Sequence, residues 1–152
     1  MGANVTAFTS SASKVDGIKK TLQADEVVLV PRGGKPSDMI TATFDIIIDT
    51  ASTEHNVEPY IHSLKPEGVF CMVGLPNQKI IIDPYDLLNN KTIAGSQIGS
   101  IAECKELLQF CAEHDISSDV KIISPQELGS AFEALETGTA CNRYVIDFIN
   151  EN

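Results

Sequence analysis

The amino-acid sequence predicts an α/β fold built on a doubly wound, mainly parallel β-sheet with helices on both faces. Short apolar, β-branched runs alternate with helical patterns along the whole of the 152 residues. Most of these runs are continuously apolar rather than alternating, which is typical of strands buried on both faces of a parallel sheet. The chain shows no internal repeat or convincing domain boundary, and its length suits one domain with its own core.

The expected strands are short apolar runs rich in Val, Ile and Phe, residue types that favour extended backbone. Residues 79–96 add two short strand candidates around a Pro-Tyr turn, near what would be the edge of the sheet. Another strand is expected at residues 144–148, after a helix near residues 126–136. The main runs, in chain order, are residues 5–8, 27–30, 44–49, 69–73 and 92–94.

Helical patterns separate these runs at residues 14–23, 54–64 and 101–114. In the third pattern, apolar residues recur at helical spacing and predict one buried stripe. Ser100 and Glu103 fit a capping box at its start. The residues of the predicted stripe are Ile101, Cys104, Leu107, Leu108 and Cys111.

The charge and cysteine content exclude several classes of function. The formal net charge is −10 and the 11 basic residues are scattered, whereas nucleic-acid binding needs clustered Lys and Arg. The 4 cysteines form no CxxC pair, and no apolar stretch is long enough for a signal peptide or a membrane span. We therefore expect a cytoplasmic protein without nucleic-acid or membrane partners.

The carboxyl ends of the expected strands share small and hydroxyl residues. In open parallel sheets, ligands bind outside these ends, and small residues let a flat ligand approach the backbone. A Ser before a helix also caps it without any ligand, so one such end has a purely structural explanation. Several together favour a nucleotide groove. The ends read FTSSASK, FDIIIDTAS, FCMVGLP and IAGSQIG.

Longer stretches carry a resemblance to a known family through their order and spacing. They are MGANVTAF, LQADEVVLV, FDIIIDTAS, LKPEGVFCMVGLP, IAGSQIGSIAE and NRYVIDF. The chain resembles the C-terminal, cofactor-binding part of zinc-dependent medium-chain alcohol dehydrogenases of the cinnamyl alcohol dehydrogenase type. The resemblance implies a Rossmann-like domain that carries NADP(H), while another domain supplies zinc and binds the alcohol or aldehyde. It also implies a sheet edge that pairs across a two-fold axis, and hence a homo-oligomer such as a dimer.

The resemblance further implies which residues contact the cofactor. Residues 9–14 would hold the 2′-phosphate, because hydroxyl groups and an ammonium suit a phosphate dianion and no carboxylate is present to repel it. We therefore expect NADP rather than NAD. Thr50 would lie near a ribose and Gly74 beside the nicotinamide, while Arg143 would approach the phosphates. The structural alternatives are that Thr50 merely ends a strand and that Arg143 pairs with an acidic neighbour. The predicted cofactor-binding residues are Thr9, Ser10, Ser11, Ser13, Lys14, Thr50, Gly74, Ser96, Gln97, Ile98 and Arg143.

Parts of the family pattern have no counterpart in this sequence. The glycine-rich GxGxxG turn, the strand before it and the N-terminal catalytic domain with its zinc ligands are missing, and the pair Gly33 and Gly34 has the wrong spacing. Gln23 stands where the family usually has Gly at a helix end. Because the missing strand is central in this topology, its loss separates the first two strands from the next three. The expectation is that the strands re-pair across the gap or that another polypeptide fills it.

These observations lead to an incomplete, Rossmann-like sheet in which residues 1–152 form a single partial NADP-binding domain. Residues from about 119 to 152 resemble the family's return toward its catalytic domain. The expected function is the NADP(H)-binding portion of an alcohol dehydrogenase, an oxidoreductase that transfers hydride between an alcohol or aldehyde and NADP. The alternatives are a truncated, non-catalytic module that associates with full-length dehydrogenase subunits, and a truncated sequence with no separate role.

The chain alone is expected to be catalytically incomplete, with neither a catalytic residue nor a metal centre. Cys104, Cys111 and His114 fall at spacings that place them on one helix face, where they could ligate a metal. Buried free cysteines on an apolar face are, however, common core residues. His55 and His62 are expected on the surface of their helix or as its caps.

Overall fold

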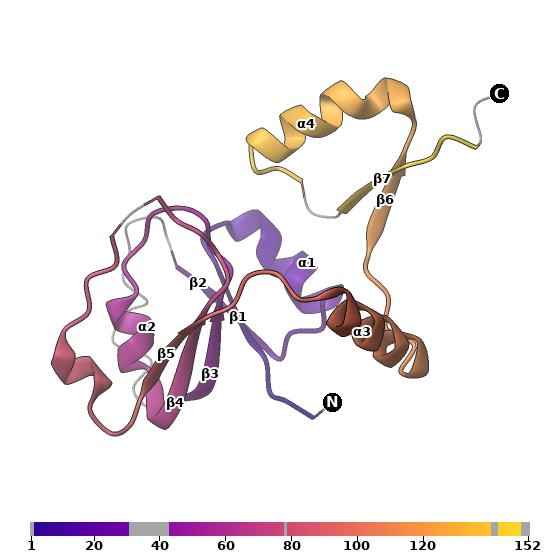
Figure 1. Ribbon diagram of the computed structural model, residues 1–152. Helices are drawn as coiled ribbons and strands as arrows, with labels where there is room; N and C mark the ends of the chain where they lie inside the picture. The colour runs from indigo at the N-terminus through magenta and orange to yellow at the C-terminus, as the bar shows by residue number, and fades with distance from the viewer. Residues whose placement is uncertain (1, 31–42, 78, 141–142, 150–152) are drawn as a thin grey trace. The chain divides into compact units, whose positions relative to one another are not determined.

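The computed structural model of the protein describes residues 2–30, 43–77, 79–140 and 143–149 (Figure 1). The chain divides into one unit at Met1–Ile98 and another at Gly99–Asn152. The pair Gly33 and Gly34 and the fourth cysteine, Cys141, lie outside the described residues.

The first unit begins with a two-stranded parallel sheet. β1 (Thr6–Thr9) pairs with β2 (Glu26–Leu29), and a 3₁₀ turn at Ala12–Lys14 and the helix α1 (Val15–Lys20) connect them. Asp25 fixes the start of the sheet, because its Oδ2 accepts a 2.7 Å hydrogen bond from the backbone N–H of Val5. Gln23, in the turn after α1, adopts a positive φ of 54°. Glycine adopts that conformation without strain, which explains the family's preference there.

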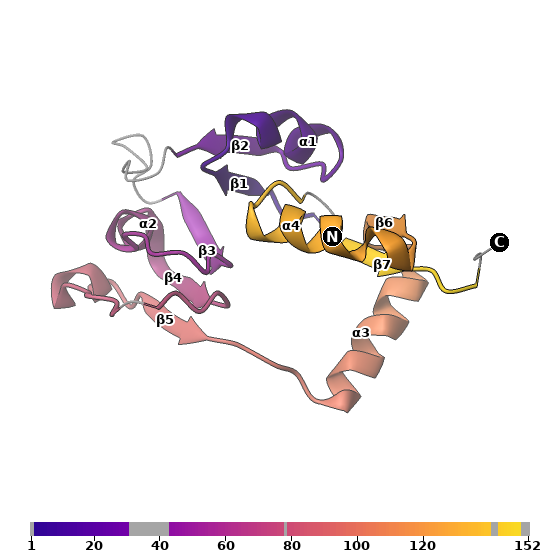
Figure 2. The same cartoon turned by 90° about the horizontal axis from the view of Figure 1, so that it is seen from above.

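A three-stranded parallel sheet follows in the same unit. β3 (Phe44–Asp49), β4 (Leu64–Met72) and β5 (Thr92–Gly95) pair in the order β3-β4-β5, and α2 (Glu58–His62) crosses between β3 and β4 (Figure 2). The core of this unit lies where α2 meets the sheet. Its buried residues are Ile47, Val57, Ile61, Leu64 and Phe70.

The two sheets of this unit remain separate. Among the described residues, no hydrogen-bonded ladder joins β1 to β3. Contacts between rings connect them instead, with the Phe8 ring 5.7 Å from that of Phe44 and 5.3 Å from that of Tyr60, both edge to face. The predicted separation of the first two strands from the next three is thus confirmed. The alternative, in which the strands re-pair across the gap, is wrong.

The prediction that the strands are buried on both faces is wrong for β3. Ile47 is 9% exposed, whereas its neighbours Ile46 and Ile48 are 63% and 65% exposed. Successive side chains of a strand point to opposite faces, and only the face of Ile47 is covered, by α2. A continuous apolar run therefore marks a strand here, but its outward face has no cover within the described residues.

Only one of the two strand candidates in residues 79–96 forms, namely β5. Residues 79–83 have no regular structure, although Ile80 and Ile82 pack against the core of the unit and Ile81 is 85% exposed. The 3₁₀ helix η2 (Pro84–Leu87) follows directly. Asp83 caps it by accepting a 2.9 Å hydrogen bond from the backbone N–H of Tyr85.

The described part of the second unit contains two α-helices and a pair of strands. α3 (Ile101–Glu113) is followed by β6 (Val120–Ile123), a 3₁₀ turn at Pro125–Glu127, α4 (Leu128–Glu136) and β7 (Arg143–Ile146). β6 and β7 pair in parallel, with Val120 opposite Arg143. No helix in the described part of the chain is long and apolar enough to cross a membrane.

The predicted capping box at the start of α3 is confirmed. The backbone N–H of Ser100 donates to Glu103 Oε2 over 2.6 Å, and the backbone N–H of Glu103 donates to Ser100 Oγ over 3.2 Å. Hydrogen bonds from the backbone and side chain of Ser100 lower the pKa of the Glu103 carboxyl. The two capping residues were therefore enough to predict where this helix begins.

The predicted buried stripe of α3 is wrong. Ile101, Leu107 and Leu108 are 78%, 62% and 69% exposed, Cys104 is exposed as well, and α3 has no buried residue. The apolar spacing correctly indicated a helix, but nothing described in its own unit covers that face. The interpretation of Cys104 as a core residue fails for the same reason.

Candidate functional site

The ends of β3, β4 and β5 lie level with one another at one edge of the three-stranded sheet. The registers align Asp49 with Met72 and Met72 with Gly95, so the residues that follow these strands leave the sheet together. The backbone N–H of Gly74 donates to Asp49 O over 2.9 Å, and that of Ser96 donates to Met72 O over 2.9 Å. The structure thus brings together the predicted site residues of all three ends.

Gly74 occupies the tightest position of this edge. A Cβ atom there would lie 2.2 Å from Ala51 O and 2.8 Å from the carbonyl carbon of Thr50, both backbone atoms. Only glycine lets the loop after β3 approach the end of β4 so closely. The backbone path that places Thr50 beside Gly74 therefore depends on the missing side chain.

Replacing Gly74 with Ala is expected to lower the free energy of unfolding by about 1–3 kcal/mol, because the new methyl group overpacks against backbone that must shift. Gly17→Ala is the matched control. Gly17 lies in α1 with nothing within 4 Å of a Cβ atom, so alanine there is expected to stabilise by about 0.5–1 kcal/mol. Urea unfolding followed by circular dichroism measures both. If both substitutions changed the free energy of unfolding equally, this would contradict the close approach of the loop after β3 to Gly74.

The remaining predicted residues of this sheet edge face solvent. Thr50, Ser96 and Gln97 are exposed, and Ile98 is 89% exposed. The edge thus combines a buried glycine with exposed polar groups and one exposed apolar side chain. A flat, partly polar ligand that lies across the three strand ends fits this combination.

At the end of β1, the predicted phosphate-binding hydroxyls form a cluster of their own. Ser11 Oγ and Ser13 Oγ lie 2.9 Å apart, and Thr9 Oγ1 accepts a 3.2 Å hydrogen bond from the backbone N–H of Ser11. Ser11 precedes the 3₁₀ turn, yet its side chain makes no capping hydrogen bond. The structural explanation of these serines as helix caps therefore loses its support. No described residue forms an ion pair with the Lys14 ammonium.

A largely buried carboxylate, that of Asp49, holds the loop after β3, and the sequence reasoning missed its contacts. Asp49 Oδ1 accepts a 3.0 Å hydrogen bond from the backbone N–H of Ala51, and Asp49 Oδ2 lies 3.1 Å from His55 Nε2. Burial raises the pKa of the nearby Tyr60 hydroxyl, and the Asp49 carboxylate adds to the rise. The sequence placed Asp49 at a strand end, but no spacing motif links it to His55.

A cavity of about 360 Å³ lies next to this loop, lined by residues 54–57 and 79–81. None of the predicted cofactor-binding residues lines it. The level strand ends, rather than this cavity, are therefore the site that the sequence reasoning anticipated.

Two further predictions concern residues elsewhere. Arg143 is exposed at the start of β7 in the second unit, so its approach to cofactor phosphates stays a prediction. Cys104, Cys111 and His114 do not form a metal-ligating group. Within the described ranges, the group whose ligand atoms converge is Glu58, His62 and Asp86.

Comparisons with known proteins place the chain among dehydrogenases. The sequence model of the family described as "Zinc-binding dehydrogenase" matches residues 1–113. Cinnamyl alcohol dehydrogenase 5 of Arabidopsis thaliana is 34% identical over 153 residues, which cover 100% of this chain and 43% of that protein.

Solved structures agree in fold. A cinnamyl alcohol dehydrogenase from Sorghum bicolor superposes with a TM-score of 0.87 at 32% identity, over 99% of this chain and 43% of its own. The cinnamyl alcohol dehydrogenase from Helicobacter pylori, complexed with NADP(H), gives a TM-score of 0.82 at 26% identity, over 100% and 43%. The chain thus spans about two fifths of the length of these relatives. The prediction of a Rossmann-like arrangement with parallel sheets is confirmed.

Proposed function

Because this chain belongs to the zinc-binding dehydrogenase family, we propose that it is the NADP(H)-binding portion of an alcohol dehydrogenase. In such an oxidoreductase, the bound nicotinamide accepts a hydride from an alcohol or donates one to an aldehyde. The chain's own contribution is to bind the cofactor and orient it. The observation that carries the proposal is the level edge of β3, β4 and β5, where Thr50, Gly74 and Ser96 meet.

The dinucleotide would lie across this edge. Exposed hydroxyl groups of Thr50 and Ser96 are suited to hydrogen bonds with ribose and amide groups. Gly74 would lie beside the nicotinamide, and its missing side chain lets the loop after β3 hold Thr50 close to the end of β4. Gln97 and Ile98 would border the nicotinamide on its far side. For Arg143, in the second unit, we propose a contact with the cofactor phosphates.

The cluster at the end of β1 supports NADP over NAD. Thr9, Ser11 and Ser13 present hydroxyl groups within one turn, and the Lys14 ammonium follows them directly. Such a group offers hydrogen bonds and a positive charge to a phosphate dianion. A carboxylate, which would favour the unmodified ribose of NAD, is absent from residues 5–15.

We assign no part of the hydride transfer to a metal on this chain. The family's name implies zinc, but no set of cysteine and histidine ligands converges in the described part of the chain. We further propose that residues from about 119 to 152 lead toward a catalytic domain, and that the protein acts in the cytoplasm.

Hydrogen exchange with and without NADPH tests the proposal. Slower amide exchange is expected in residues 9–14 and 96–98 and around Thr50 and Gly74, because bound cofactor shields these strand ends and restricts their opening. The surface of α4, which carries no predicted site residue, serves as the internal control. A folded chain whose exchange is unchanged by NADPH at these positions would contradict the proposal.

The second candidate is a non-catalytic module that associates with dehydrogenase subunits. The exposed apolar side chains of Ile46 and Ile48 on β3, and of Leu107 and Leu108 on α3, favour it. In either case we expect a homo-oligomer, such as a dimer, formed through the sheet edge at β5. A folded, self-associated chain without cofactor protection would favour this candidate over the first.

A further inference from the structure

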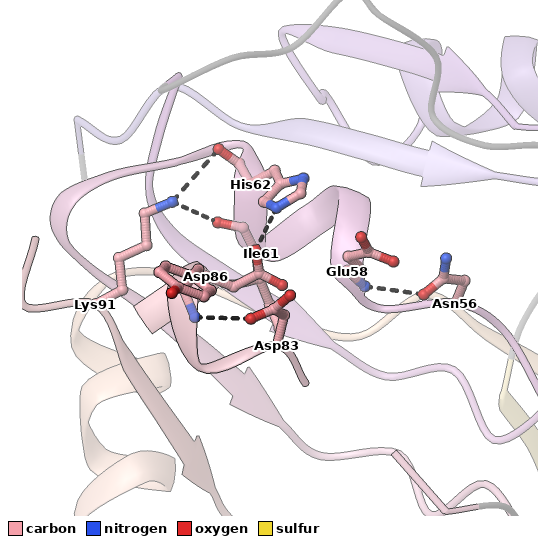
Figure 3. Close-up of polar contacts among 8 residues, drawn as sticks. Asn56, Glu58, Ile61, His62, Asp83, Asp86 and Lys91 are labelled. Carbon is pink, nitrogen blue, oxygen red and sulfur yellow. Dashed lines mark hydrogen bonds and ion pairs between the residues drawn. The ribbon is translucent and has the colours of Figure 1, made fainter. Parts of the chain in front are cut away.

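Three ionisable side chains from two separate elements converge beside the core of the first unit. Glu58 and His62 lie one turn apart on α2, and Asp86 belongs to η2. Each offers one ligand atom, and these atoms all lie within 4.8 Å of one another. Figure 3 shows the Asp86 carboxylate directed at the His62 ring, with Glu58 on the same helix.

Asp86 carries the strongest indication of a missing partner. It is 7% exposed, its Oδ1 bonds with His62 Nε2, and its buried Oδ2 has no hydrogen-bond partner within the described residues. A buried carboxylate oxygen without a partner is costly, and native proteins seldom leave one so. A cation at this point would satisfy it.

The neighbouring polar groups are already engaged elsewhere. Asp83 caps η2 through the backbone N–H of Tyr85, and Asn56 Oδ1 accepts a 3.1 Å hydrogen bond from the backbone N–H of Glu58. Lys91 Nζ donates to Ile61 O over 2.9 Å, at the end of α2 (Figure 3). Asn56 and Asp83 thus hold the starts of α2 and η2, while the Lys91 ammonium is committed to backbone carbonyl groups rather than to Asp86.

We propose that Glu58, His62 and Asp86 bind a divalent transition-metal ion of the zinc type. One imidazole and two carboxylates suit such an ion better than Mg²⁺ or Ca²⁺, which prefer oxygen ligands alone. Three protein ligands leave one tetrahedral position for water. On binding, His62 would coordinate the ion through a ring nitrogen that carries no proton, and any proton displaced from that nitrogen would be released to solvent.

The site joins α2 to η2 rather than serving hydride transfer. Val57, the N-cap of α2, and Ile61 within the helix are 3% and 0% exposed, so the ion would fix a helix on which the core of this unit depends. Metal binding is therefore expected to raise the melting temperature of the chain, because the ion binds the folded state and not the unfolded one.

Calorimetric titration of the chelator-treated chain of 152 residues with Zn²⁺ tests the site, and Co²⁺ absorption reports on its ligands. One ion per chain is expected. Glu58→Gln and His62→Gln are each expected to weaken binding at least tenfold. Both side chains are exposed, so these variants should fold; Asp86→Asn extends the test to the buried ligand.

His55→Gln is the matched control, since His55 also contacts a largely buried carboxylate, that of Asp49, but belongs to no converging group of three within the described residues. Its zinc affinity should equal that of the unaltered chain. Absence of binding to the folded chain, or affinity unchanged in both Glu58→Gln and His62→Gln, would overturn the site. Loss of binding in His55→Gln alone would move the ion to the other histidine and overturn it as well.

Discussion

Replacing Phe70 with Ala is expected to lower the free energy of unfolding by about 3–5 kcal/mol, the range for large buried aromatic residues. Phe70 is 1% exposed in β4 and belongs to the core cluster with Ile61 and Leu64, which are 0% and 1% exposed. A domain has only about 5–15 kcal/mol of stability in total. The substitution is therefore expected to remove between about a fifth and all of that stability.

Thermal and urea unfolding followed by circular dichroism measure this effect. Ile81→Ala is the control, because Ile81 is an equally apolar side chain in the same unit that is 85% exposed. Its substitution is expected to change the free energy of unfolding by less than about 0.5 kcal/mol. If Phe70→Ala costs no more than Ile81→Ala, the core does not lie between α2 and the sheet.

The double variant Ser11→Asp with Lys14→Ala is expected to reverse the cofactor preference. It removes the ammonium that follows the serine cluster and places a carboxylate where the 2′-phosphate would lie. Each hydrogen bond to a charged group contributes about 1.5–3 kcal/mol, and about 1.4 kcal/mol corresponds to a tenfold change in affinity. Affinity for NADPH is therefore expected to fall at least about 100-fold, while NADH binds as well as before or better.

Dissociation constants for NADPH and NADH, measured on the same preparations, give this preference. Lys20→Ala removes an equal charge nearby, from an exposed lysine on α1 that lies 3.6 Å from Asp16, and should leave the ratio unchanged. A parallel loss of both cofactors in the double variant would indicate a folding defect. An unchanged ratio would show that residues 9–14 do not hold the 2′-phosphate.

Much of the local structure could be predicted because its signals are local. β3 occupies residues 44–49 as predicted, and α3 begins at the capping box that Ser100 and Glu103 form. The burial of these elements could not be predicted in the same way. An apolar spacing shows which face of an element could be covered, whereas coverage depends on other elements. Ile48 and Leu108 illustrate the difference, at 65% and 69% exposed.

The part of the candidate site that follows from the parallel order of the strands could be predicted. Parallel strands bring their carboxyl ends to one edge, so Thr50, Gly74 and Ser96 could be expected together. The partners of His55 and His62 could not, because no sequence pattern links them. Asp86 lies 24 residues after His62, in the 3₁₀ helix η2 that forms at the predicted Pro-Tyr turn. Only the folded chain brings such residues into contact.

Titration of the purified chain with NADPH and, in parallel, with NADH tests the central proposal most directly, by fluorescence or by heat. Saturable binding at one site per chain is expected, with NADPH bound more tightly than NADH. The absence of saturable binding to a chain that circular dichroism shows to be folded, or tighter binding of NADH, would contradict it.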